Sequence, residues 1–368
     1  MNPKNRKYSI PYNGADPQWY VDEVMRRKKH VDHVFCELPV SDIVSHIRFI
    51  FGNGRRSDAV ADYVRSVYMD NCVEFLKLSR GLFRRICPVN AMYYPFSSSK
   101  ERVEFALRIV RLVCAYGIDG LIVTDYSLAL ILRQLMPDLE LHTSCNCYQW
   151  NLKQMQMWRD NVGIAMFNPP REILRFPERL KEMHDAGFRL KCIVNEGCLV
   201  GCPNTFNHQM SLSLGCSFDG GCFQNGCGDL LRGNWILPRW QRHYDRYVDV
   251  YKIAGRNSEG DYPFVCLDAF IREEDRMPLH RVMVSGTIAY GEVVMPDLVF
   301  DRLTLDMVPD RLMSCGCLEC DRCTLCRNVV RKCIPKEYCD AIDGIKQNRL
   351  AIDGLESLRA NGFVTAGV

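Results

Sequence analysis

Residues 101–144 decide the fold class and read ERVEFALRIVRLVCAYGIDGLIVTDYSLALILRQLMPDLELHTS. The apolar positions of the opening part recur with a helical period, and Gly120–Asp125 is a short apolar run typical of a buried strand. A second helix over Ser127–Leu135 stops before Pro137, and Glu140–Ser144 is the next strand-like run. A strand, a helix and a further strand in this order predict two parallel strands joined by a crossover helix.

The same alternation extends over much of the chain. Eight strand-like runs lie at Lys7–Asn13, Val31–Leu38, Arg85–Tyr93, Gly120–Asp125, Glu140–Ser144, Val162–Asn168, Arg189–Asn195 and Tyr247–Ala254. Eight alternating units predict an α/β fold, a (β/α)8 TIM-type barrel, whose active site lies at the carboxyl ends of the strands. We therefore expect a barrel over residues 1–275 and a C-terminal extension over 276–368.

Composition and charge exclude several classes of protein. The net charge of +3 is too small to predict a nucleic acid or an anionic membrane as the partner. No apolar run is long enough to span a membrane, and the N-terminal MNPKNRKYSI is not followed by the apolar stretch of a secretory signal. We expect a cytoplasmic protein, in which the 20 cysteines are better explained as metal ligands than as disulfides.

A cysteine-rich loop, residues 197–246, follows the seventh strand-like run. It contains Cys198, Cys202, Cys216, Cys222 and Cys227. The first two are four residues apart, so a helical turn would place both thiols on one side, and glycines before these cysteines let the backbone bend around a cluster. Four thiolates predict a 4Fe–4S cluster; zinc and buried apolar cysteines are the alternatives.

A second cysteine block lies in the extension. Cys317, Cys320, Cys323 and Cys326 follow one another at three-residue steps, with Cys315 and Cys333 nearby. Such steps match the way a ferredoxin chain wraps a 4Fe–4S cluster. Zinc is the alternative at this block, although paired zinc knuckles have a longer loop between their halves. The sequence therefore predicts a second cluster, with the fourth ligand open among Cys326, Cys333 and Cys315.

Polar residues at the ends of the strand-like runs are the candidate catalytic groups. They are Asp125, His142, Glu196 and Arg256, together with His208 from the cysteine loop. Arg256 ends the eighth run, and a guanidinium at the barrel mouth suits a substrate carboxylate because it offers two parallel hydrogen bonds. The alternative role of each residue is structural, either to cap a helix or to position a neighbouring side chain.

Four motifs, in order, resemble those of the collagenase-like peptidase family, the group known as unassigned-peptidase thirty-two. They are Gly117–Asp125, Pro137–Ser144, the cysteine loop and Tyr251–Arg256. The resemblance covers residues from about 100 to 275. The chain departs from the family pattern where it has Ser144-Cys145-Asn146 in place of Ser-Thr-Gln, and its first cysteine pair is more closely spaced.

The resemblance implies redox chemistry more than proteolysis. Members of the family include anaerobic ubiquinone-pathway hydroxylases and enzymes that hydroxylate tRNA or ribosomal RNA. They hold a 4Fe–4S cluster with cysteines of this loop, and several take the oxygen atom from prephenate. Carried over to this chain, Cys198 and Cys202 match the first cysteine pair and Cys222 and Cys227 the later pair, with Cys216 as a further candidate.

We therefore expect an iron–sulfur-dependent, oxygen-independent hydroxylase, or a related redox enzyme, that uses a small carboxylate such as prephenate as oxygen donor. The modified substrate stays open among a small molecule, RNA and a peptide. One alternative is a collagenase-like peptidase, although the chain has no His-Glu-x-x-His motif. Another is a non-catalytic iron–sulfur subunit that relays electrons with a partner protein.

Overall fold

The computed structural model describes residues 5–39, 58–94, 96–213, 226–256, 258, 260–283, 302–315 and 322–350. Cys216, Cys222, Cys317 and Cys320 lie outside these ranges. Among the described helices, none has the length and apolar character needed to cross a membrane.

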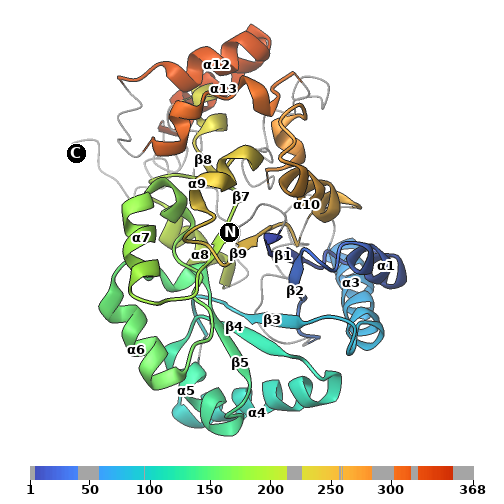
Figure 1. Cartoon of the computed structure of the whole chain (residues 1–368). Helices are drawn as coiled ribbons and strands as arrows, with labels where there is room; N and C mark the ends of the chain where they lie inside the picture. The colour runs from blue at the N-terminus through green and yellow to red at the C-terminus, as the bar shows by residue number, and fades with distance from the viewer. Residues whose placement is uncertain are drawn as a thin grey trace, which may run out of the picture.

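A curled sheet of seven parallel strands forms the centre of the molecule (Figure 1). Its strands are β1 (Tyr8–Pro11), β2 (Val31–Phe35), β3 (Arg85–Val89), β4 (Gly120–Val123), β5 (Glu140–Thr143), β6 (Lys191–Ile193) and β9 (Val250–Lys252). Their order in the sheet is β5-β4-β3-β2-β1-β9-β6. Consecutive strands are therefore neighbours from β1 to β5, as the alternating pattern predicts.

Residues 165–167 link the two edges of this sheet. Met166 forms a parallel bridge with His142 of β5, and Phe167 forms one with Leu190 beside β6. The backbone N–H of Lys191 donates to the carbonyl of Phe167 over 2.7 Å. All eight strand-like runs thus lie around one barrel-like sheet, and the sixth contributes short bridges rather than a full strand.

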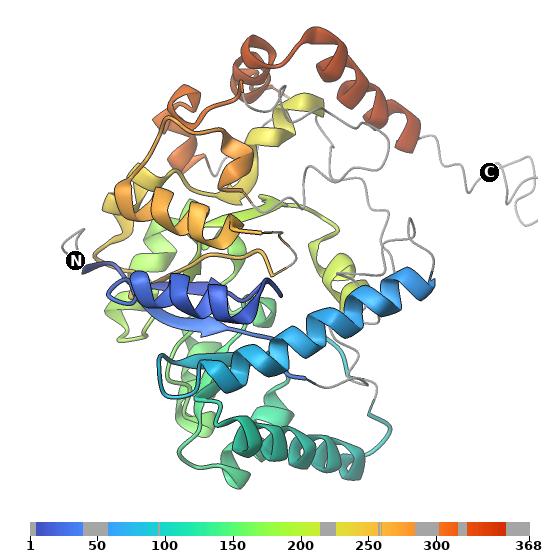
Figure 2. The ribbon, with the colours of Figure 1, turned by 90° about the vertical axis from the view of Figure 1, so that its right-hand side faces the viewer.

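Helices cover the outer face of the sheet. They are α1 (Pro17–Arg26), α3 (Asp58–Leu78), α4 (Ser99–Tyr116), α5 (Tyr126–Leu135), α6 (Leu152–Val162), α7 (Pro177–Asp185) and α10 (Tyr262–Arg272). The first two lie side by side (Figure 2). Local sequence sets the bounds of α4, because Ser98 caps its first turn and Gly117 ends it in the left-handed conformation, with φ of 60°.

One expected helix is divided in two. The segment Glu172–Asp185 was expected to be a single helix, but it forms the 3-10 turn η3 (Arg171–Arg175) followed by α7. The physical reason is Pro177, which begins α7 and disfavours a helical conformation for Phe176 before it. Because of this break, η3 is separate from α7 and lies at the carboxyl ends of the strands.

The cysteine loop adds a small layer over the sheet. Its elements are the antiparallel pair β7 (Asn195–Leu199) and β8 (Gly233–Trp235), then α8 (Thr205–Ser213), η4 (Gly226–Leu231), η5 (Pro238–Trp240) and α9 (Gln241–Tyr244). The Asn195 side-chain amide donates to the carbonyl of Ala254 and accepts from its backbone N–H, and these two hydrogen bonds hold β7 beside the end of β9. The loop expected to carry a metal is therefore anchored to the sheet at its start.

The extension packs on this layer. Its described elements are η6 (Leu279–Arg281), η8 (Leu305–Met307), η9 (Asp310–Ser314), α12 (Leu325–Cys333) and α13 (Lys336–Leu350). Helices α12 and α13 lie against η4 (Figure 1). On the other side, Asp310 accepts hydrogen bonds from Arg239 and from the indole of Trp240, over 2.8 and 2.6 Å. The division of the chain at residue 275 stays a prediction.

Candidate functional site

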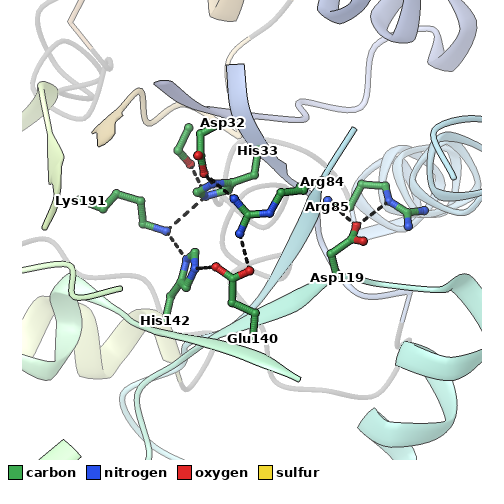
Figure 3. A network of polar contacts seen from close by, with 9 residues as sticks. Asp32, His33, Arg84, Arg85, Asp119, Glu140, His142 and Lys191 are labelled. Atoms are coloured by element: carbon green, nitrogen blue, oxygen red, sulfur yellow. Dashed lines mark hydrogen bonds and ion pairs between the residues drawn. The ribbon is translucent and has the colours of Figure 1, made fainter. Parts of the chain in front are cut away.

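A network of charged and polar side chains fills the barrel interior at the amino ends of the strands (Figure 3). We call it the floor network; its members are Ser9, Asp32, His33, Arg84, Glu140, His142 and Lys191. The centre is Lys191, which is fully buried. Its Nζ lies 2.9 Å from His142 Nδ1 and 3.3 Å from His33 Nε2.

The hydrogen bonds assign the protons of the two imidazoles. His142 Nε2 lies 2.7 Å from Glu140, and His33 Nδ1 lies 2.7 Å from Asp32. Because ionised carboxylates only accept, these ring nitrogens carry hydrogen and the other two accept from Lys191. Arg84 donates to both carboxylates. Two cations thus face two anions, and the network is balanced in charge.

Burial and charge keep both imidazoles neutral at neutral pH. Burial, reinforced by the Lys191 charge, lowers the pKa of His33 to about 4 and lowers that of His142 well below its usual range. Burial alone would raise the pKa of Glu140, but hydrogen bonds from His142 and Arg84 lower it to about 2. Burial and the charge of Lys252 lower the pKa of Lys191 well below its usual range, while the carboxylates of Asp32 and Glu140 oppose that shift and favour the charged form.

The floor network corrects the expected position of His142. The sequence pattern placed this residue at the barrel mouth as a candidate catalytic group, because it comes near the end of the fifth run. Its imidazole instead points into the barrel, toward Glu140 and Lys191, which begin β5 and β6. Residues at the amino-terminal face of such folds contribute to stability.

Replacement of Lys191 by Met should lower the free energy of unfolding by about 3 kcal/mol, because two imidazoles lose a buried donor and two carboxylates lose a balancing charge. Urea unfolding monitored by circular dichroism measures the change. The control is Lys181→Met, which removes an exposed ion pair with Asp185 and should change stability little. Equal effects of the two substitutions would contradict a central role for Lys191.

Acidification should destabilise the fold between about pH 6.5 and pH 4. In this window His33 is protonated in the unfolded chain but neutral in the folded one, so the unfolded state binds more protons. The loss from His33 alone should be on the order of 2 kcal/mol between pH 7 and pH 5. Urea titrations at several pH values test this, and a constant unfolding midpoint would contradict neutral buried histidines.

The second polar assembly lies at the mouth, the carboxyl ends of the strands, and centres on Arg171 of η3. Its guanidinium is buried and donates to the Asn146 side-chain oxygen over 2.7 Å and to the Tyr148 hydroxyl over 3.0 Å. Glu196 lies 3.6 Å from its Nε, beyond hydrogen-bond distance. Burial alone would lower the pKa of Arg171, but interactions with Cys145, Cys198, Glu196 and Tyr148 together raise it well above its usual range.

A second buried cation, Lys252 at the end of β9, faces the same assembly. Its Nζ lies 4.8 Å from the centroid of the Phe35 ring. Burial lowers its pKa, Cys145 and Glu196 oppose that shift, and Arg171 adds to it. Burial, together with the charge of Arg171, also lowers the pKa of His208. The structure therefore brings His208 and Glu196, two of the predicted residues, close to Arg171.

Several mouth residues have unused hydrogen-bonding capacity. Asn168 is fully buried, and neither its oxygen nor its nitrogen has a partner among the described residues. The same holds for the amide of Gln149 and for Oε2 of Glu172. Buried polar atoms are normally satisfied, so an unsatisfied group next to a buried guanidinium indicates a place for a polar ligand.

Arg256, the predicted carboxylate-binding residue, follows β9 and already has a partner. Its guanidinium forms an ion pair with Glu37, which follows β2, and lies over the Phe35 ring. Burial lowers its pKa to about 10. A second acceptor, such as a substrate carboxylate, would have to share this guanidinium with Glu37.

Asp125 follows β4 and caps the next helix. Its carboxylate accepts a hydrogen bond of 2.8 Å from the backbone N–H of Leu128 in the first turn of α5, and Arg102 lies 3.8 Å away. This is the helix-cap reading of the residue. Its predicted catalytic role stays a prediction.

The cysteines expected to hold metal are divided between two places. Cys198 lies on β7 near Arg171, and Cys202 follows in the turn after that strand. Cys227 lies in η4, where it contacts Cys339 of α13. Cys323 is exposed just before α12, and Cys326 lies within that helix. Within the described ranges, no group of three or more His, Cys, Asp or Glu residues is arranged to hold a metal ion.

Comparisons with known proteins bear on this geometry. Residues 87–194 match the model of peptidase family U32. The match spans less than a third of the chain. A protein named as an uncharacterized protease, from Methanocaldococcus jannaschii, is 22% identical over 238 residues, which are 60% of this chain and 68% of that protein. The solved structure titled as that of the U32 peptidase Mk0906 is 11% identical and covers 70% of this chain and 94% of its own, with a TM-score of 0.45.

The match to peptidase family U32 confirms the family resemblance, but it covers only part of the residues that carry this resemblance. The matched range contains most of β3 to β6, with Arg171 and the floor residues His142 and Lys191. It stops at residue 194, one residue before β7 and ahead of the cysteine loop. The iron–sulfur part of the resemblance therefore lies outside the matched residues.

Reasoning from the sequence missed three residues of the mouth, Arg171, Lys252 and Asn146. One signal was available, since Asn168-Pro-Pro-Arg171 follows the sixth strand-like run, and polar residues after a strand belong at the mouth. Arg171 was passed over because the segment after it has a helical pattern. Lys252 was passed over because it lies inside an apolar run.

Proposed function

We propose that the chain is an enzyme that performs an oxygen-independent hydroxylation, or a related redox modification, at the mouth of a (β/α)8 barrel in the cytoplasm. The observation that supports it is the place of Cys198, the first cysteine of the predicted cluster, next to the buried Arg171. A cluster held there would lie close to a substrate bound by this guanidinium. The U32 domain supports an enzyme in general terms.

Only some of the cysteines predicted to hold the cluster lie within the described residues. Cys198 lies in β7, Cys202 follows four residues later in the turn after it, and both side chains are half-buried. They are two of the four thiolates that a 4Fe–4S cluster needs, and Cys216 and Cys222 lie outside the described residues. When bound, the cluster would supply one-electron transfer. A second cluster, or zinc, at the block around Cys323 and Cys326 stays part of the proposal.

The mouth residues have separate tasks in this proposal. Arg171 binds a carboxylate of the small oxygen donor, for which prephenate is the model, because two of its five N–H groups already hold it against Asn146 and Tyr148. Lys252 adds a second positive charge. The unsatisfied amide of Asn168 offers two N–H donors and an acceptor oxygen to the uncharged part of the ligand. His208 is the group that holds or releases a proton.

Two other functions remain as alternatives. The names of the relatives favour a peptidase. The thiol of Cys145 contacts the side chain of Asn146, and that of Cys147 contacts backbone carbonyls of Val123 and Thr124, so neither thiol is paired with a histidine base. The third function, electron relay with a partner subunit, would need no small-molecule site at the mouth.

Iron content and activity test the proposed function directly. Protein purified without oxygen should contain about four irons per cluster, and Cys198→Ala with Cys202→Ala should remove one cluster and the redox activity but leave the circular dichroism unchanged. Cys114→Ala, a change at an exposed cysteine of α4, is the control. Iron-free protein that still cleaves casein would establish the peptidase alternative.

Arg171→Lys should weaken binding of a small dicarboxylate at least tenfold, about 1.4 kcal/mol, since the charge is kept and the planar fork is lost. Calorimetric titration with prephenate measures this. Arg256→Lys is the matched comparison, because Glu37 already occupies that guanidinium, and its effect should be below threefold. The reverse order of effects would return the carboxylate site to Arg256.

A further inference from the structure

Arg175 is the last residue of the 3-10 turn η3, and Arg171 of the mouth is its first. The buried guanidinium of Arg175 donates to the backbone carbonyls of Gly233 and Trp235, over 3.1 Å each, and to that of Leu312. The first two carbonyls belong to β8 in the cysteine loop, and the third belongs to η9 in the extension. One side chain therefore joins three segments that are far apart in the sequence.

The Arg175 guanidinium is a buried charge without an acidic partner in the described ranges. Its central carbon lies 5.7 Å and 5.9 Å from the ring centroids of Trp235 and Trp240, two indoles that stack on each other. A buried cation is costly unless other contacts replace its hydration, and here carbonyls and indole faces do so. Because an apolar side chain would fill this space at a lower cost, stability alone does not account for the arginine.

The two arginines hold η3 from opposite ends. Arg171 is bound in the mouth by Asn146 and Tyr148, and Arg175 is bound to β8 and η9. Between them, the Tyr244 hydroxyl donates to a carbonyl of η3 over 2.7 Å. A short 3-10 turn has weak backbone hydrogen bonding of its own, so these side chains fix where it lies. A shift of η3 would therefore turn the Arg171 guanidinium away from a carboxylate bound at the mouth.

The extension also supports Arg175 through an exposed carboxylate. Asp310, the first residue of η9, accepts hydrogen bonds from the Trp240 indole over 2.6 Å and from Arg239 over 2.8 Å. Trp240 is one of the two rings beside Arg175, and Leu312, which accepts from Arg175, lies two residues after Asp310. The Asp310 side chain is itself 71% exposed, so its replacement loosens these contacts without opening the core.

We propose that Arg175 is a positioning residue through which the extension orients η3 and so sets the carboxylate affinity of Arg171. The contacts run from Asp310 and Leu312 of η9 to Arg175, and along η3 to Arg171. The inference rests on the proposed function, in which Arg171 binds the carboxylate. Arg175 does not touch that carboxylate; it fixes the direction in which Arg171 presents its remaining N–H groups. The extension is thus a working part of the site at the barrel mouth.

Calorimetric titration of the full-length chain with prephenate measures the expected effect. Arg175→Met keeps the length of the side chain but removes its donors, and it should weaken binding about tenfold. Arg175→Lys keeps the charge and should recover part of that loss, because an ammonium replaces some of the hydrogen bonds. Asp310→Ala should weaken binding about threefold although this residue is exposed and outside the mouth. The control is Asp340→Ala, at an exposed carboxylate of α13, which should leave the affinity unchanged.

A double-variant cycle separates positioning from general damage to the fold. A lysine at position 171 is flexible and depends less on the orientation of η3. In a chain that already carries Arg171→Lys, the change Arg175→Met should therefore weaken binding by less than about twofold. An equal loss in both backgrounds would overturn the proposal, because the effect of Arg175 would not pass through Arg171.

Hydrogen exchange followed by mass spectrometry reads the same coupling without a ligand. Within η3 and its flanks, the N–H of Ile173 donates to Pro170 over 3.0 Å and that of Phe176 to Ile173 over 2.9 Å. Peptides that cover residues 168–176 should exchange about tenfold faster in Arg175→Met and measurably faster in Asp310→Ala, while peptides from α4 and β4 keep the wild-type rates. Should Arg175→Met fail to fold by circular dichroism, Asp310→Ala alone decides the test.

Failure of this proposal can be told apart from failure of the proposed function. A wild-type chain that binds no prephenate contradicts the carboxylate site at Arg171, and the exchange rates of η3 then decide whether the extension orients this turn. Prephenate binding that stays at the wild-type affinity in Arg175→Met and Asp310→Ala, or exchange of η3 that stays at the wild-type rate in both, overturns the role of Arg175.

Discussion

The ammonium of Lys191, fully buried between two imidazoles, is the constraint that organises the barrel. A buried cation is costly unless it is paired and hydrogen-bonded, and here the compensation comes from residues on or beside five different strands. Ser9, His33, Arg84, Glu140 and Lys191 belong to the amino ends of β1, β2, β3, β5 and β6 or directly precede them. The network therefore ties the two edges of the curled sheet together from inside.

A layered interior follows from this arrangement. Above the floor network, Phe35, Ile86 and Ile122 form a small apolar cluster separate from the main core. Lys252 lies over the Phe35 ring, and Arg171 and Glu196 lie beyond it at the carboxyl ends of the strands. The floor is balanced in charge and hydrogen bonding, whereas the mouth keeps unsatisfied polar atoms. We therefore assign the proposed chemistry to the mouth and a structural role to the floor.

Much of the fold was predictable because its signals are local. Short apolar runs such as Gly120–Val123, with a capped helix on each side, identify themselves without reference to the rest of the chain. The face of the sheet on which a side chain lies depends on contacts with distant parts of the sequence. Strand side chains alternate, so the layer occupied by His142 depends on its pairing with Ile122 and on the neighbouring Lys191, which no single run reveals.

The site was predictable only in part for the same reason. Arg256 and Glu196 were placed at the mouth by their position after strands, but the ion pair with Glu37 and the contact with Arg171 join residues from distant segments. Cys227 was assigned by spacing to the first cysteine block, and its contact with Cys339 depends on how the extension packs on η4.

We propose that the redox centre and the carboxylate site share one mouth, above a floor that is structural. Anomalous diffraction at the iron edge, from crystals of anaerobically purified protein soaked with a small dicarboxylate, tests it most directly. Iron density is expected at Cys198 and Cys202 and carboxylate density at Arg171, with none at the floor network. Absence of iron at Cys198 and Cys202, or a carboxylate bound far from Arg171, would contradict a shared mouth.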